Sequence, residues 1–177
     1  ELKNLVGSAE LRYRFFFVTK ARAARGARAL VADAPLMPHN TKPKMIPSSA
    51  KGKKSTTEFK LLSESSLGWA LWEATTSFLR PHQVRVHAAV QELPVMGDVL
   101  YAGPEAPLLS TLLPNKRTSG IKFPVLDGLA LHLREVVLPA SGEEAATVSL
   151  RAELPRHFRV MLQRMQLPLP EAEAAEA

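Results

Sequence analysis

The sequence predicts an α+β fold in which a largely antiparallel, mixed sheet carries a few flanking helices. Strand-like segments rich in β-branched and aromatic residues outnumber the helical patterns, and turn-like sequences join several of them in pairs, as in hairpins. The chain has 177 residues, of which 46% are hydrophobic and 23% charged. This length and composition are typical of one globular domain with a core of its own.

Six segments are predicted to be strands, and four of them pair as two hairpins. The turn-like sequence ESSLG joins the first pair, and a Ser-Gly-Glu-Glu turn joins the second. The first strand, RYRFFFVT, combines aromatic and β-branched residues, which suit a pleated sheet. The predicted strands are, in chain order, 12–19, 30–36, 56–62, 69–78, 129–139 and 147–153.

Fewer segments have helical character. Residues 82–90 fit a helix, and a second helix is expected to begin near Pro155, because proline suits a first helical turn. Residues 2–11 resemble the end of a helix, and the basic residues 20–28 suit either a short helix or an extended arm. Four apolar side chains of the second helix recur at helical spacing and should face the core, namely Phe158, Met161, Leu162 and Met165.

One domain is expected over residues 1–168, followed by an acidic tail, residues 169–177. Residues 38–55 are predicted to be a basic loop within this domain, because residues 38–54 hold three prolines and five lysines and are too polar for a core element. A loop of about 15 or more residues in a compact domain is usually functional or disordered.

The positive charge is concentrated in the first half of the chain. The formal net charge is +6, from 23 basic and 17 acidic side chains, and residues 12–60 alone hold 12 basic and 2 acidic ones. Such a segment can attract a polyanion such as nucleic acid. The alternative is a solvated surface that only aids solubility.

Several classes of function find no support in the residues. The chain has no cysteine, which excludes disulfides, thiolate metal sites and cysteine nucleophiles. His82 and His87 lie five residues apart without a carboxylate in ligand spacing, so no metal site is predicted. The sequence contains no Gly-x-Ser-x-Gly motif of serine hydrolases, no Gly-x-Gly-x-x-Gly motif of dinucleotide-binding proteins and no Walker motif of nucleotide hydrolases. No stretch approaches the roughly 20 apolar residues of a membrane span.

The strongest candidate site follows the predicted strand 69–78. Residues 80–87 (RPHQVRVH) place two arginines, two histidines and a glutamine directly after this strand. Sites are often built where a rigid strand ends, and the planar arginine fork binds phosphate or carboxylate through paired hydrogen bonds. The alternative is a surface turn that merely carries charged side chains.

This segment resembles a motif of the pseudouridine synthases that modify uridines of large-subunit ribosomal RNA and of tRNA. The family carries Gly-Arg-Thr-His-Gln-Ile/Leu-Arg-Val-His, and residues 79–87 here read LRPHQVRVH. Leu79 and Pro81 depart from the family's glycine and threonine, which changes the backbone freedom of this turn. Further segments are similar to family motifs in the same order: RY at 12–13, GKKSTTEF at 52–59, LWE at 71–73, PVMGDVLY at 94–101, LH at 131–132 and LPRHF at 154–158.

The resemblance implies the pseudouridine synthase catalytic fold and the isomerisation of uridine to pseudouridine in rRNA or tRNA, without a cofactor. The target base would first leave its helix or loop and enter a pocket. Arg85 would pair with the catalytic aspartate, and a cation at that position would keep the carboxyl ionised. Tyr13 would stack near the flipped base.

The same resemblance assigns the RNA contacts. Side chains beside the pocket would touch RNA or shape the pocket mouth, and lysines of the basic loop would hold phosphates. These predicted RNA-binding residues are Arg80, His82, Gln83, Lys51, Lys53 and Lys54.

One family motif is absent. The family's catalytic aspartate lies in His-Arg-Leu-Asp-x-x-Thr-Ser-Gly, upstream of the strand at 12–19, and none of Asp33, Asp98 and Asp127 has that context. Because the chain begins at Glu1 without a methionine, we expect the catalytic segment to lie upstream in a longer protein, and this chain alone to be inactive.

Other interpretations remain open at this point. The chain could be a non-catalytic relative that binds ribosomal RNA as an assembly or structural factor, or a basic domain that binds protein. Asp98 suits a turn cap better than a catalyst, and His132 suits a packed strand. We expect a monomer with RNA as its partner and no membrane association, located in the cytoplasm or in an organelle matrix.

Overall fold

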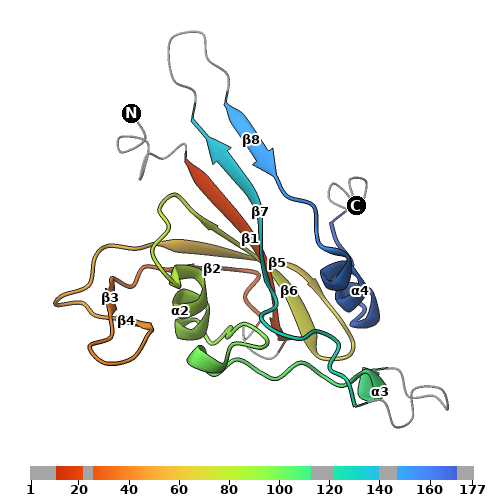
Figure 1. The fold of residues 1–177 in the computed structure, drawn as a ribbon. Coiled ribbons are helices and arrows are strands. Elements are labelled where there is room, and N and C mark those ends of the chain that lie inside the picture. Colours follow the sequence, from red (N-terminus) through yellow and green to blue (C-terminus); the bar gives the residue numbers. More distant parts are fainter. Residues whose placement is uncertain (1–10, 22–25, 113–121, 140–146, 171–177) are drawn as a thin grey trace.

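The computed structural model describes residues 11–21, 26–112, 122–139 and 147–170. Six strands form one sheet in the order β2-β5-β6-β1-β7-β8 (Figure 1). Every pair in this sheet is antiparallel, so no parallel pair makes it mixed among the described residues. The α+β prediction is confirmed. The strands are β1 (Arg12–Lys20), β2 (Ala29–Ala32), β5 (Thr57–Glu64), β6 (Trp69–Thr76), β7 (Leu131–Leu138) and β8 (Val148–Arg151).

Strand β1 lies in the middle of the sheet and is apolar on both faces. Because successive side chains of a strand point to opposite faces, Phe15 and Phe17 enter one core cluster, whereas Phe16 and Val18 enter the other. Phe16, Phe17 and Val18 are fully buried. The run RYRFFFVT therefore forms a strand, as predicted, and the structure shows that this strand is covered on both faces.

A helix covers each face. Helix α2 (Gln83–Val90) packs Val84 and Ala88 into the cluster that contains Phe15 and Phe17. Helix α4 (Arg156–Arg164) covers the opposite face. Pro155 is its N-cap, and the predicted stripe of Phe158, Met161, Leu162 and Met165 is buried, as expected. A short helix, α3 (Leu109–Leu112), and a 3-10 helix, Val99–Tyr101, complete the described helices.

The predicted basic loop is more ordered than expected. Part of it forms a two-stranded antiparallel ribbon, in which β3 (Leu36–Pro38) pairs with β4 (Met45–Pro47) beside α2 at one end of the molecule (Figure 1). The single strand predicted over 30–36 is wrong, because β2 ends at Ala32 and β3 begins at Leu36. Leu36 and Met45 are buried against Val86 of α2. The prolines and lysines concealed this element, because only two apolar side chains attach it to the core.

Some sequence expectations fall outside the described residues. These include the predicted helix end at 2–10, residues 22–25 of the basic stretch 20–28, the turn at 141–144 and residues 171–177 of the acidic tail. Within the described part, Leu169 still packs against the α4 core cluster. No described helix is long and apolar enough to cross a membrane.

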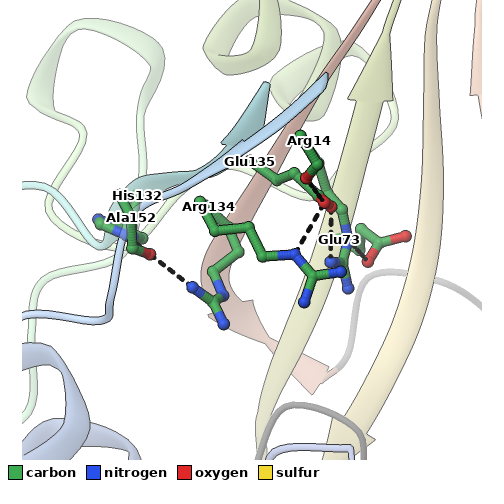
Figure 2. A network of polar contacts seen from close by, with 8 residues as sticks. Arg14, Glu73, His132, Arg134, Glu135 and Ala152 are labelled. Atoms are coloured by element: carbon green, nitrogen blue, oxygen red, sulfur yellow. Dashed lines mark hydrogen bonds and ion pairs between the residues drawn. The ribbon is translucent and has the colours of Figure 1, made fainter. Parts of the chain in front are cut away.

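A network of charged side chains on β6, β1, β7 and β8 lies on the same sheet face as α4 (Figure 2). Arg14 of β1 donates from Nε to Glu73 Oε2 at 2.5 Å and from Nη1 to Glu135 Oε2 at 3.2 Å. Glu135 also accepts from Ser149 and, at 2.9 Å, from Arg151 Nε. Arginine and carboxylate side chains therefore join the neighbouring strands β6, β1, β7 and β8.

Glu135 is the centre of this network. Burial alone would raise its pKa, but the hydrogen bonds from Ser149, Arg151 and Arg14 together lower the pKa from 4.5 to about 2. A carboxyl with a depressed folded-state pKa stabilises the fold above its unfolded pKa, and this contribution is lost as pH falls.

We predict that acid unfolding reports this linkage directly. The free energy of unfolding should fall as pH drops from about 4.5 towards 2, because the unfolded chain then binds a proton that the native Glu135 does not. Glu135→Gln should lower stability at pH 7 by about 1–3 kcal/mol and flatten the pH dependence. Chemical denaturation across pH would measure both effects. Glu153→Gln, at an exposed carboxylate, is the control, and a parallel pH profile in Glu135→Gln would contradict the assignment.

Candidate functional site

The candidate site begins with a tight turn after β6. The amide of Gln83 donates to the carbonyl of Arg80 at 3.1 Å, which closes a turn with Pro81 and His82 in the middle. His82 has a φ of 54°, and a positive φ at the third residue is characteristic of a type II turn, where proline is favoured at the second position. Pro81, a departure from the family motif, therefore suits this backbone, whereas His82 is held in a conformation that costs free energy and is common at functional sites.

The side chain of Gln83 holds this turn in place through hydrogen bonds. Its Oε1 accepts from the Arg80 amide at 3.0 Å. Its Nε2 lies 2.9 Å from Thr76 Oγ1 and 3.0 Å from the Thr56 carbonyl. Gln83 is only 1% exposed. The sequence predicts that Gln83 contacts RNA or shapes the pocket mouth. Its side-chain amide forms hydrogen bonds within the protein, and the residue lines the cavity described next.

A cavity of about 380 Å³ opens between this turn and the sheet. Its walls combine apolar side chains from β1, β7 and the turn with three cationic or imidazole groups. The residues that line it are Phe15, Leu79, Arg80, Pro81, His82, Gln83, Val84, Arg85 and Leu131. An apolar pocket with a few convergent polar groups is the usual form of a ligand site.

Arg85 is held in this wall by an ion pair within the chain. Its Nε and Nη2 donate to Asp98 Oδ2 and Oδ1, each at 2.7 Å, in a paired arrangement. The Asp98 side chain is fully buried and that of Arg85 is 18% exposed. The hydrogen bond to Asp98 raises the pKa of Arg85 further. The guanidinium is thus turned inward. Its carboxylate partner in this chain is Asp98, for which the sequence predicts a turn cap.

Asp98 does also cap a turn. Its Oδ1 accepts from the amides of Leu100 and Tyr101, each at 3.2 Å, at the start of the 3-10 helix. The preceding Gly97 has a φ of 81°, and a Cβ there would lie 2.0 Å from the Gly128 carbonyl oxygen. Only glycine fits this close approach, so the Gly-Asp pair fixes where the carboxylate sits.

Tyr101 completes the cluster around Arg85. The guanidinium lies over its ring at 5.1 Å from the centroid, within the range of a cation–π contact. The Tyr101 hydroxyl accepts from the Met45 amide at 2.9 Å and lies 3.0 Å from His82 Nδ1. Burial raises the pKa of Tyr101, and burial followed by the Arg85 charge lowers that of His82. Both effects favour a protonated phenol beside a neutral imidazole.

Arg80 and the three predicted lysines lie where the basic segment meets the turn. Arg80 donates from Nε and Nη2 to the Lys54 carbonyl, each at 3.0 Å, and stacks on Phe78 at 4.4 Å. Lys51, Lys53 and Lys54 are exposed. Arg80 therefore contacts the backbone of the segment that carries the three lysines.

Tyr13 lies outside the cavity wall. It is half-buried in β1, opposite Thr76 of β6 and Val136 of β7. It faces the same side of the sheet as Phe15, two residues along the strand, and Phe15 does line the cavity. Tyr13 is thus at the edge of the site.

His87 and His132 both contact neighbouring residues of the fold. His87 lies between Thr57 Oγ1 at 2.8 Å and the Ala34 carbonyl at 2.9 Å, and burial lowers its pKa. His132 lies 3.4 Å from the Ala152 carbonyl and near Phe158, a packed strand position as the sequence indicates. Across the described residues no group of three His, Asp or Glu side chains could hold a metal ion.

Comparisons with known proteins bear on this site. No protein-family model matches the chain. The mitochondrial pseudouridylate synthase RPUSD4 of Xenopus tropicalis is 32% identical over 102 residues, which cover 54% of this chain and 30% of that protein. Its human counterpart of the same name is 31% identical over 130 residues, which cover 69% of this chain and 33% of that protein. The chain is related to the RNA pseudouridine synthases.

A solved structure supports the same fold. Human RNA pseudouridylate synthase domain containing 4 superposes with a TM-score of 0.67 at 24% identity, covering 96% of this chain and 68% of that one. The expected pseudouridine synthase-like fold is therefore confirmed. The aligned regions span about a third of the length of the curated RPUSD4 relatives.

The sequence contains the GDVLY motif, but it does not show which residues Asp98 and Tyr101 contact. Asp98 as the partner of Arg85, and Tyr101 as the residue beneath it, come from the fold of the loop after α2. Neither the motif PVMGDVLY nor the motif LRPHQVRVH indicates by itself that the two segments lie close together in the fold. The available signal was the pairing of a lone aspartate with an aromatic residue three positions later.

We predict that Asp98→Asn destabilises the protein by about 2–3 kcal/mol, because it leaves a partly buried guanidinium without a counter-charge. Equilibrium denaturation at pH 7 measures the effect. Asp127→Asn, at an exposed aspartate, is the matched control. In a double-mutant cycle with Arg85→Gln the two losses should be strongly non-additive, and additive losses would show that the pair does not act as a unit.

Proposed function

We propose that the chain is the C-terminal portion of the catalytic domain of an RNA pseudouridine synthase that acts on rRNA or tRNA. The observation that carries the proposal is the cavity at the end of β6, with Arg85 fixed in its wall by residues of the motif that resembles the family's. The relationship to pseudouridine synthases in sequence and fold supports it.

In this reaction the bond from the uracil N1 to the ribose breaks, the base turns, and a bond forms from its C5 to the same ribose carbon. N1 gains a proton and C5 loses one, so no oxidant or cofactor is needed. The catalytic aspartate is not part of this chain. Two of the five guanidinium N–H groups of Arg85 are used by Asp98, which leaves donors for a second carboxylate from the catalytic segment.

The remaining residues of the site have roles that follow from their positions. The apolar wall made by Phe15, Val84 and Leu131 suits the faces of a planar base that has left its stack. Tyr13, two positions from Phe15 on the same strand face, is placed to contact the nucleotide at the edge of the cavity. His82 and Arg80 lie in the cavity wall, and Arg80 also binds the backbone carbonyl of Lys54 in the segment that carries the exposed lysines.

RNA is the partner that this arrangement fits. The exposed lysines of the basic segment can neutralise phosphates and release counterions, and Arg80 extends their charge to the turn that forms the cavity wall. We propose further that the protein is a monomer. The named RPUSD4 relatives are mitochondrial proteins, and for this chain we propose a location in the cytoplasm or in an organelle matrix.

A second candidate is a non-catalytic relative that binds ribosomal RNA as an assembly or structural factor. One observation favours it. Arg85 already has a complete paired carboxylate partner in Asp98, so the fold holds this arginine in place without any catalytic aspartate. The two candidates share RNA binding and differ only in chemistry.

We predict that neutralising Lys51, Lys53 and Lys54 to glutamine weakens RNA binding about 10-fold or more at moderate salt and reduces the slope of log affinity against log salt by about two to three. Filter binding with structured RNA across salt concentrations measures both quantities. Replacing Arg156, Arg159 and Arg164 of α4, on the other sheet face, is the matched change of three charges. An unchanged slope in the lysine variant would place the phosphate contacts elsewhere.

We predict that Arg85→Ala in the complete product of the gene lowers pseudouridine formation by at least about 100-fold, a far larger effect than the roughly 10-fold or smaller loss of RNA binding expected when Asp98 and Tyr101 are no longer fixed by the ion pair. Chromatography of the RNA nucleosides with mass-spectrometric detection measures the product, because pseudouridine and uridine have the same mass and must first be separated. The comparison with Arg85→Lys separates charge from geometry, because lysine keeps the charge without the paired fork. Full activity in Arg85→Ala would remove this residue from the proposed mechanism. No pseudouridine from the wild-type protein would favour the non-catalytic candidate.

A further inference from the structure

The basic ribbon, residues 36–54, is attached to the cavity turn at three kinds of contact. Leu36 and Met45 pack against Val86 and Tyr101. The Lys54 carbonyl accepts from Arg80. The Met45 amide donates to the Tyr101 hydroxyl at 2.9 Å. The ribbon is thus connected to both α2 and the loop that carries Asp98.

The Tyr101 hydroxyl is where these connections meet. It lies within hydrogen-bond distance of the Met45 amide, of the Met45 carbonyl at 3.3 Å, and of His82 Nδ1 at 3.0 Å. A phenol donates one proton and accepts through its lone pairs, so it can accept from the ribbon and donate to the imidazole. Its ring meanwhile lies under the Arg85 guanidinium.

The ribbon also has the charge of an RNA-binding surface, in the turn between its two strands and in the segment that follows β4. Between Asp33 and Glu58 the sequence contains five lysines and no acidic residue. Lys42 lies in the turn of the ribbon and is exposed, and Lys51, Lys53 and Lys54 lie on the returning segment. His39 closes that turn, because its Nδ1 accepts from the amides of Thr41 and Lys42 at 3.1 and 3.2 Å. The positively charged surface is therefore an ordered element and not a loose loop.

We propose that Tyr101 is a positioning residue that holds the basic ribbon at a fixed place beside the cavity turn, so that one RNA is bound by the ribbon lysines and by the cavity together. This inference rests on the proposed RNA-binding function. Tyr101 acts through Met45 and His82 and need not touch RNA itself. Without its hydroxyl, the ribbon keeps its apolar contact and its link to Arg80 but loses the bond that fixes Met45.

The alternative is that Tyr101 only stabilises the fold. The two roles differ in what they do to RNA binding. A purely structural hydroxyl would lower the stability of Tyr101→Phe without altering the contribution of the lysines. A positioning hydroxyl makes that contribution depend on Tyr101, so the two changes become non-additive.

The test is a double-mutant cycle on RNA affinity with this chain. It combines Tyr101→Phe with the glutamine replacements of Lys51, Lys53 and Lys54. We expect Tyr101→Phe alone to weaken binding of a structured RNA about 5-fold and to reduce the salt slope, with the lysine variant weakening it about 10-fold or more. The combined variant should bind no more weakly than about twofold below the lysine variant.

Thr19→Val is the matched control, because it also removes a hydroxyl with a hydrogen bond to a backbone carbonyl, that of Pro94 at 2.7 Å, away from the ribbon. It should leave RNA affinity and its salt slope unchanged. Hydrogen exchange should show a faster-exchanging Met45 amide in Tyr101→Phe and not in Thr19→Val. This second measurement is made without RNA, so it reports the ribbon attachment directly.

The outcomes are separable. If Tyr101→Phe binds RNA like the wild type, or if the losses in the combined variant multiply, the positioning role is overturned while RNA binding stands. Unchanged exchange at Met45 would overturn it as well. If the unaltered chain shows no salt-dependent RNA binding, the proposed function fails and this inference fails with it.

Discussion

The paired ion contact between Arg85 and Asp98 is the interaction on which the candidate site depends. It joins helix α2 to the loop before the 3-10 helix, thirteen positions later in the chain. A carboxylate with no exposed surface is stable only with its counter-charge and hydrogen bonds in place. Once Asp98 is fixed, Tyr101 lies beneath the guanidinium, and the turn at His82 and the ribbon at Met45 are both tied to it.

The two faces of the sheet have different roles: the face covered by α2 carries the cavity, and the face covered by α4 contributes to stability. On the α2 side, apolar residues of β1 and β7 form one wall of the cavity and the turn after β6 forms the other. On the α4 side, the buried stripe of that helix and the network centred on Glu135 stabilise the sheet (Figure 2). The alternation of Phe15 and Phe16 along one strand serves both sides. Changes to the α4 face should therefore act on stability, and changes to the α2 face on the site.

Much of the fold could be predicted from the sequence, because its signals are local. The strand RYRFFFVT, the hairpin across ESSLG and the apolar stripe of α4 follow from side-chain periodicity. The ribbon β3–β4 could not be predicted in this way, since a segment with three prolines and five lysines reads as a loop and is ordered by tertiary contacts of Leu36 and Met45. Local propensity is a weak guide where so few side chains decide.

The site shows the same division. The segment 79–87 could be singled out from the sequence, because its residue types suit anion binding and sites are often built at strand ends. The partner of Arg85 could not be found, because a long-range ion pair leaves no periodic pattern. The surroundings of Gln83 are long-range in the same way: its amide nitrogen lies within hydrogen-bond distance of oxygens of Thr56, Thr57 and Thr76, which no local sequence pattern indicates.

The most direct test of this account is nitrogen-15 NMR of the arginine side chains in the chain itself. The account predicts one Nε–H, assigned to Arg85, that exchanges slowly with water and has a shifted resonance, because it donates to a buried carboxylate. An Arg85 Nε–H that exchanges as fast as that of an exposed arginine would contradict the pair, and with it the organisation of the site.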